Sequence, residues 1–223
     1  MGHGHGAEGL IRVRHMARSL TEILDPSRTA VVLQECQNGI IGTESGLPAM
    51  AEAAQSSGCI DAVVRLVHAA RAAGVRVIHS IFHQRADGWG DNTDLELFKV
   101  IDESPVKLRP GSAAVQVLEQ IGVEPADFTI IRHHGVSPFP TSELDPVLRN
   151  EGVRTIVPAG VSVNWAITGL TFDAINRGYD VVIPRDAVTG IPAEYVEMAI
   201  DHSLAFVSTI STTADIVAAW SGA

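Results

Sequence analysis

The sequence predicts an α/β fold: a doubly wound, mostly parallel six-stranded sheet with helices on both faces. Short apolar runs rich in β-branched residues alternate along the chain with longer segments whose apolar residues recur at helical spacing. Strands that alternate with helices are joined by right-handed crossovers, which build a three-layer, Rossmann-like architecture. The expected strands cover residues 31–33, 75–82, 128–131, 154–157, 181–184 and 205–210.

Helix-starting and helix-stopping residues bound the expected helices. The longest covers residues 48–73: Pro48 opens it, Gly74 closes it, and Gly58 marks a kink or a break within it. A helix over 163–177 ends at Gly178, and one over 213–220 is capped by Thr212 or Thr213. The other expected helices cover residues 111–121, 144–150 and 192–202, whereas the polar segment 83–99 is expected to be a loop.

Composition and charge restrict the partners and the location. The 223 residues suffice for one domain with a full core, and 46% of them are hydrophobic. The formal net charge of −10 argues against a nucleic-acid partner, because no basic stripe would neutralise phosphates. No apolar run approaches the roughly 18 residues of a membrane-spanning helix, and the glycine-rich start lacks the apolar core of a signal peptide. We therefore expect a cytoplasmic protein that acts on a small-molecule substrate and not on membranes.

The chain is expected to divide into an N-terminal extension, residues 1–24, that is partly disordered or tag-like, and one domain, residues 25–223. His3 and His5 in the extension would bind metal only weakly. Cys36 and Cys59 match neither a disulfide framework nor a zinc site. Four histidines, His79, His83, His133 and His134, could in principle approach one another, but a histidine at a strand end is more often simply hydrogen-bonded. No cofactor and no metal are expected.

Three strand ends that carry polar residues are expected at one edge of the sheet, where ligands of open α/β sheets bind. Glu35 follows the first strand, Arg132 and His133 follow the third, and a turn into the 163–177 helix follows the fourth. A carboxylate beside Arg or His is a natural acid–base pair, since charge and burial set its pKa. The expected substrate contacts are Gln37, His83, Trp89, Phe139, Asn164 and Trp165, although packing of a loop or helix explains Trp89 and Trp165 equally well.

Three stretches carry a resemblance to a known family: VVLQECQNG, RHHGVSPFPTSELDPVLRNEGVRTIVPAG and GVSVNWAITGLTFDAINRGYDVVIPRDAV. From about Pro26 to Trp220, the chain resembles the isochorismatase-like hydrolase superfamily. The resemblance implies a doubly wound α/β fold and a homo-oligomer such as a dimer or tetramer. It also implies a non-proline cis peptide at Val161-Ser162, a strained feature typical of functional sites.

The sequence departs from the family's aspartate, lysine and cysteine at all three positions, so the triad is degenerate. The aspartate position is Glu35 and the cysteine position is Ala166. The lysine position falls on Arg132 when counted from the preceding anchor and on His133 when counted from the following one, so both remain candidates. Because alanine has no nucleophilic atom, the covalent thioester route to amide hydrolysis is lost.

Two hypotheses from different classes follow. In the first, the protein hydrolyses a vinyl-ether or C–N bond of a small, anionic metabolite without a covalent intermediate. Glu35 is then the general acid, with a pKa raised by burial, and Arg132 or His133 holds a substrate carboxylate. Ala166 leaves room for the substrate ring, as the small residue does in isochorismatases proper. In the second hypothesis, the pocket is catalytically inactive and is kept for small-molecule binding or for assembly, because all three triad positions are altered. The side chain of Glu35 is also one methylene longer than the family's aspartate, which counts against the acid role.

Overall fold

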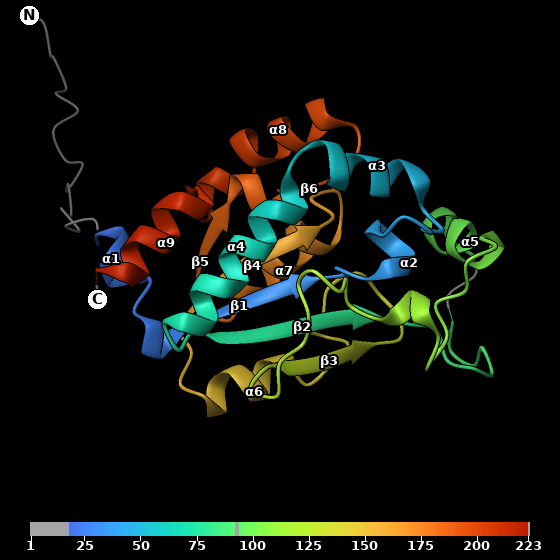
Figure 1. Ribbon diagram of the computed structural model, residues 1–223, viewed down its shortest axis with the longest axis horizontal. Helices are drawn as coiled ribbons and strands as arrows, with labels where there is room; N and C mark the ends of the chain where they lie inside the picture. Colours follow the sequence, from blue (N-terminus) through green and yellow to red (C-terminus); the bar gives the residue numbers. More distant parts are fainter. Residues whose placement is uncertain (1–17, 92–93, 223) are drawn as a thin grey trace, which may run out of the picture.

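The computed structural model describes residues 18–91 and 94–222 and has the predicted architecture, a parallel sheet between two helical layers (Figure 1). Within the described residues the sheet has seven strands in the order β3-β2-β1-β4-β5-β7, and β6 pairs with β4. The named strands all pair in parallel. They are β1 (Thr29–Gln34), β2 (Arg76–Phe82), β3 (Phe128–Arg132), β4 (Thr155–Val161), β5 (Asp180–Pro184), β6 (Val188–Thr189) and β7 (Thr209–Ser211).

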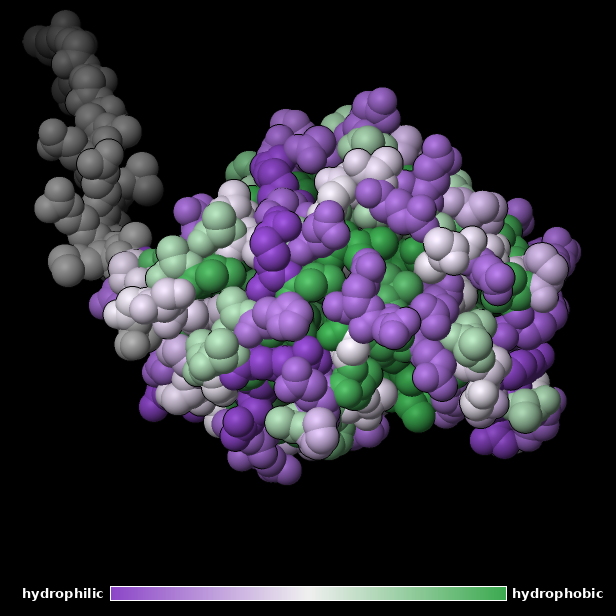
Figure 2. Space-filling view, viewed as in Figure 1, coloured by the Kyte–Doolittle hydropathy of each residue, from purple (hydrophilic) through white to green (hydrophobic). Residues whose placement is uncertain are grey.

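Two apolar cores lie on opposite faces of the sheet. β1 is buried on both faces because its side chains alternate between the two faces. Val31 and Leu33 join one core, which also contains residues of α4 (Cys59–Ala72) and α9 (Thr213–Ser221). Ala30 and Val32 join the other, which contains residues of α6 (Leu144–Asn150), α7 (Ala166–Asn176) and α8 (Ala193–His202). The helices are α1 (Leu20–Ile23), α2 (Asn38–Ile41), α3 (Pro48–Ser56), α4 (Cys59–Ala72), α5 (Glu96–Glu103), α6 (Leu144–Asn150), α7 (Ala166–Asn176), α8 (Ala193–His202) and α9 (Thr213–Ser221). In the view of Figure 1, apolar side chains gather in the middle of the face, and hydrophilic ones surround them (Figure 2).

The segment predicted as a helix over residues 111–121 is not one. It contains a single 3₁₀ turn, Ala113–Val115, because its backbone pairs with the chain that follows β1. Val117 forms an antiparallel bridge with Gln37, and the Leu118 N–H donates to the Cys36 carbonyl at 3.0 Å. Val115, Leu118 and Ile121 are buried all the same, so the spacing of these apolar residues resembled that of a helix.

Three other boundaries differ from the prediction. The long helix at 48–73 is two helices, α3 and α4, because Gly58 has φ +75° and breaks it. The strand expected at 205–210 is a 3₁₀ turn, Leu204–Phe206, followed by the shorter β7. The segment 83–99, predicted as a loop, contains the start of α5, and the short α2 and β6 were not predicted.

The domain begins before residue 25. α1 contacts α9, Leu24 is 1% exposed in the core, and the Trp220 indole N–H donates to the Leu24 carbonyl at 3.1 Å. Part of the predicted extension over residues 1–24, from residue 18 onward, thus packs against the domain, while His3 and His5 lie outside the described residues. No helix in the described part of the chain is long and apolar enough to cross a membrane.

The strand register brings the predicted site residues to one edge of the sheet. Gln34, the last residue of β1, lies opposite Gly160 of β4, and Phe82 of β2 lies opposite Arg132 of β3. Gly160 has φ +100°, and a Cβ there would lie 2.4 Å from the Gln34 carbonyl oxygen, so only glycine fits. Glu35, Arg132 and the turn after β4 thus meet at the carboxyl ends of neighbouring strands.

Candidate active site

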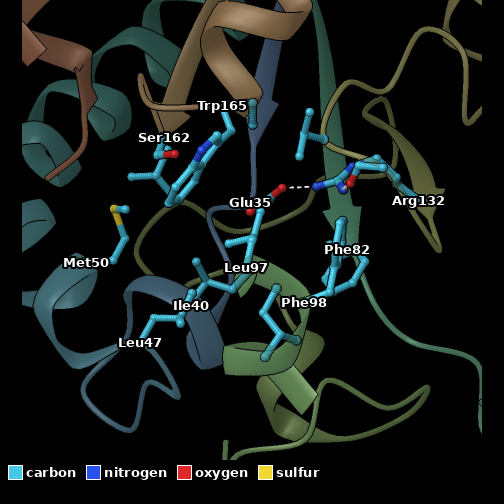
Figure 3. Close-up of a pocket in the computed structure, with 15 residues that line it drawn as sticks. Glu35, Ile40, Leu47, Met50, Phe82, Leu97, Phe98, Arg132, Ser162 and Trp165 are labelled. Atoms are coloured by element: carbon cyan, nitrogen blue, oxygen red, sulfur yellow. Dashed lines mark hydrogen bonds and ion pairs between the residues drawn. The ribbon is translucent and has the colours of Figure 1, made fainter. Parts of the chain in front are cut away.

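A narrow pocket, with a cavity volume of about 40 Å³, opens at this edge of the sheet (Figure 3). Ile40, Leu47 and Met50, from α2 and the start of α3, form one apolar wall. Leu97, Phe98 and Ile101 of α5 form another, and Phe82 and Val161 end the strands below. Among the described residues that line it, the charged side chains are Glu35 and Arg132. The pocket is therefore an apolar cavity with one ion pair, the usual composition of a small-molecule site.

Glu35 enters the pocket from a strained backbone position. Its φ is +53°, and among the described residues it is the non-glycine residue with a positive φ. The left-handed conformation of an L-residue costs about 1–2 kcal/mol, and such residues are held where the surrounding structure fixes them. The Glu35 N–H donates to the Ser80 carbonyl at 3.0 Å, and its carbonyl accepts from the Gln37 N–H at 2.8 Å. This turn ends β1 and directs the carboxylate into the pocket, where the side chain is 18% exposed.

Arg132 is the partner of Glu35. Its guanidinium donates from Nη2 to Glu35 Oε1 and from Nη1 to the Gly135 carbonyl, and it lies over the Phe82 ring at 4.9 Å. Burial lowers the pKa of Arg132 to about 10, so the side chain stays charged at neutral pH. Its Nε–H has no hydrogen-bond partner among the described residues. Of the two candidates for the lysine position, Arg132 is therefore the one that contacts Glu35.

His133 and His83 lie outside the pocket lining. His133 Nδ1 is 3.1 Å from the His83 carbonyl oxygen, and the two imidazole rings meet edge to face at 4.8 Å. The imidazole of His79 is bonded to Asp127, with Nε2 2.9 Å from Oδ2. In the described part of the chain, no group of three or more His, Cys, Asp or Glu side chains is arranged to hold a metal ion.

Four of the predicted substrate contacts have other positions in the structure. Gln37 is fully buried and holds the end of β2, accepting from the Phe82 N–H at 2.7 Å and donating to the Phe82 carbonyl at 2.8 Å. Asn164 pairs with both backbone groups of Ile191. Phe139 packs in the core, and Trp89 is 79% exposed on its loop. None of these four residues lines the pocket. The prediction failed because a sequence pattern does not distinguish a side chain that holds a loop from one that faces a ligand.

Ala166 and Trp165 do line the pocket, at the start of α7. The preceding Val161-Ser162 peptide is cis, as the family resemblance predicted. Ala166 places a methyl group in the pocket lining, at the residue that the sequence predicts to correspond to the family's cysteine. Neither cysteine can replace that thiol, because Cys36 and Cys59 are both buried, and burial raises the pKa of Cys59 to about 12.

The apolar walls of the pocket were not predicted from the sequence. The largest omission is α5, which supplies Leu97, Phe98 and Ile101. These residues recur at helical spacing, so the signal was present, but the polar residues before them obscured it.

The comparisons with known proteins agree on one family. The isochorismatase domain model matches residues 29–215. The chain is 27% identical to the ureidoacrylate amidohydrolase of Rhizobium rhizogenes, over 87% of this chain and 84% of the relative. Its fold is similar to that of a cysteine hydrolase from Pseudomonas syringae (TM-score 0.76, 24% identity, 89% of this chain and 94% of that one). It is also similar to that of N-carbamoylsarcosine amidase from Thermoplasma acidophilum (TM-score 0.65, 19% identity, 83% and 96%). The chain belongs to the isochorismatase-like hydrolase family.

Proposed function

We propose that the protein hydrolyses a small molecule by direct attack of water on a carbonyl carbon, without a covalent intermediate. The observation that carries the proposal is the Glu35–Arg132 ion pair in the wall of an apolar pocket, beside an alanine at the family's nucleophile position. The pair preserves one negative and one positive charge although both residue types differ from the family's. A pocket whose described lining holds no cysteine but does hold a carboxylate can still activate water.

In the proposed reaction, the Glu35 carboxylate accepts a proton from water as the water oxygen attacks the carbonyl carbon. The electron pair of the C=O bond moves to oxygen, and the Arg132 guanidinium stabilises the resulting negative charge. The tetrahedral intermediate collapses when the bond to the alcohol or amine breaks, and Glu35 returns its proton to that leaving group. The Nε–H of Arg132 is buried and has no acceptor among the described residues.

The ion pair supports the base role of Glu35 over the acid role predicted from the sequence. A guanidinium in contact with a carboxylate favours the ionised form. An ionised Glu35 can accept a proton from water but cannot donate one to an enol ether. The Nη2 contact therefore favours carbonyl hydrolysis over the vinyl-ether reaction.

The test is product release from neutral esters, simple amides and isochorismate, with the wild type, Glu35→Gln and Glu52→Gln. Glu52 is exposed on α3 and gives the same chemical change outside the pocket. Loss of the base should lower kcat/KM about 10²–10⁴-fold in Glu35→Gln and leave Glu52→Gln unchanged. Pyruvate release that declines as pH rises would instead establish the acid role. No turnover of any substrate would show that the pocket binds without cleaving.

A further inference from the structure

An apolar groove leads out of the pocket between α3 and α5. The groove and the pocket share four lining residues: Leu47, Met50, Leu97 and Trp165. Beyond them the groove is continued by Val100 of α5 and by Ile191. Because the same side chains line both spaces, the groove directly adjoins the pocket that holds the ion pair.

α5 has an apolar face that the rest of the described chain covers only in part. None of its residues is buried, and Val100 is 45% exposed. An amphipathic helix of a globular protein normally turns that face to a core. Here Leu97, Phe98 and Ile101 face the pocket and Val100 faces the groove. The face of α5 therefore lines the pocket and the groove, and Ile101 also packs against one of the cores.

The charges along this path do not require a charged ligand. Of the described residues that line the pocket and the groove, Glu35, Arg132 and Glu96 are charged. Arg132 is already neutralised by Glu35, and Glu96 would repel an anion. A ligand carboxylate would lose its water shell without gaining a free cation, which is unfavourable in an apolar site. This result differs from the anionic substrate expected from the sequence.

We infer that the ligand is a neutral amphiphile, with a single carbonyl group at Arg132 and an extended apolar part in the groove between α3 and α5. The assignment of the carbonyl as the reacting group rests on the proposed function. The occupancy of the groove does not require turnover.

The experiment measures binding of unreactive neutral carbonyl compounds, so it is independent of hydrolysis. Linear methyl ketones with four to ten carbon atoms are titrated calorimetrically into the wild type, Val100→Asn and Val123→Asn. Val123 is 52% exposed and lines neither space, so it is the matched control. Each methylene that becomes buried should tighten binding about fourfold, until the chain reaches the end of the groove. Val100→Asn should bind the shortest ketones normally and gain less from each added carbon, whereas Val123→Asn should follow the wild type.

Carboxylates of the same chain lengths provide the charge test and should bind more weakly than the ketones at neutral pH. Tighter binding of the carboxylates, or an affinity independent of chain length, overturns the inference. So does a groove closed by a second copy of the chain: light scattering would then show an oligomer that Val100→Asn dissociates. If the ketones bind with the expected length dependence but no ester or amide is hydrolysed, the groove assignment stands and the proposed function fails.

Discussion

Replacing Glu35 by glycine and by alanine separates the strain at this residue from its ion pair. Both substitutions remove the carboxylate and leave Arg132, which is 3% exposed, without its partner. The two variants differ only in a Cβ at a residue whose φ is +53°. Their difference in stability therefore measures the backbone conformation that directs position 35 into the pocket.

The expected difference follows from two opposing terms. A left-handed residue with a Cβ costs about 1–2 kcal/mol, which glycine avoids. Glycine loses more chain entropy on folding, which offsets about 0.5–1 kcal/mol of that gain. We expect Glu35→Gly to be more stable than Glu35→Ala by about 1 kcal/mol, or about 3 °C in Tm for a chain of this size.

Urea unfolding of both variants gives the two free energies, with Glu52 as the control site. Glu52 lies within α3, where glycine should be less stable than alanine by about 1 kcal/mol, so the order of the two variants reverses. If alanine is as stable as glycine at position 35, the residue is not held in the left-handed conformation. The geometry that carries the proposed mechanism would then be wrong.

Three further predictions concern the ion pair, the thiols and a buried histidine. Arg132→Met should lower the free energy of unfolding by about 3 kcal/mol, because it leaves the partly buried Glu35 carboxylate without its partner. The control Arg76→Met breaks an exposed ion pair with Glu151 and should lower it by less than about 1 kcal/mol. Urea titration measures both free energies. Iodoacetamide at pH 8 should leave the folded wild type unlabelled, because burial raises the thiol pKa values of Cys36 and Cys59. It should alkylate Ala166→Cys once, as measured by mass spectrometry of the intact protein. Burial lowers the pKa of His79 below its ordinary 6.5, although Asp127 acts in the opposite direction. A histidine whose pKa is lower in the folded state contributes fully to stability above pH 6.5 and loses this contribution as the pH falls. The free energy of unfolding of the wild type should therefore decline more steeply between pH 7 and pH 5 than that of His79→Gln.

The order of strands and helices could be predicted because burial on both faces gives short, unmixed apolar runs, as in β1. Residues 111–121 show the limit of that method. Their apolar side chains are spaced as in a helix, but the backbone pairs with the chain after β1 instead. A partner from another part of the chain decided the conformation, and spacing along one segment does not report such a partner.

Some residues of the candidate site could likewise be predicted from the sequence, and others could not. Glu35, Arg132 and Ala166 line the pocket together, and the sequence pointed to them because of the strand ends and the family resemblance. The choice between Arg132 and His133 depends on which side chain the end of β3 directs toward Glu35, and the register of β2 and β3 sets that direction. Gln37 and Asn164 were expected at the ligand because they follow strand ends, but backbone groups of Phe82 and Ile191 occupy their amides.

Because α5 lines the pocket and the groove from outside the cores, its residues can change with little effect on the stability of the fold. Its side chains line the pocket and the groove, yet none is buried and none belongs to the main cluster of either core. Substitutions there remove little apolar burial, so they remain within the stability margin of an ordinary domain. The sheet and its ion pair can stay fixed while changes in a single eight-residue helix alter which molecules fit. Such an arrangement lets related proteins acquire new substrates by changing one surface segment and leaving the cores intact.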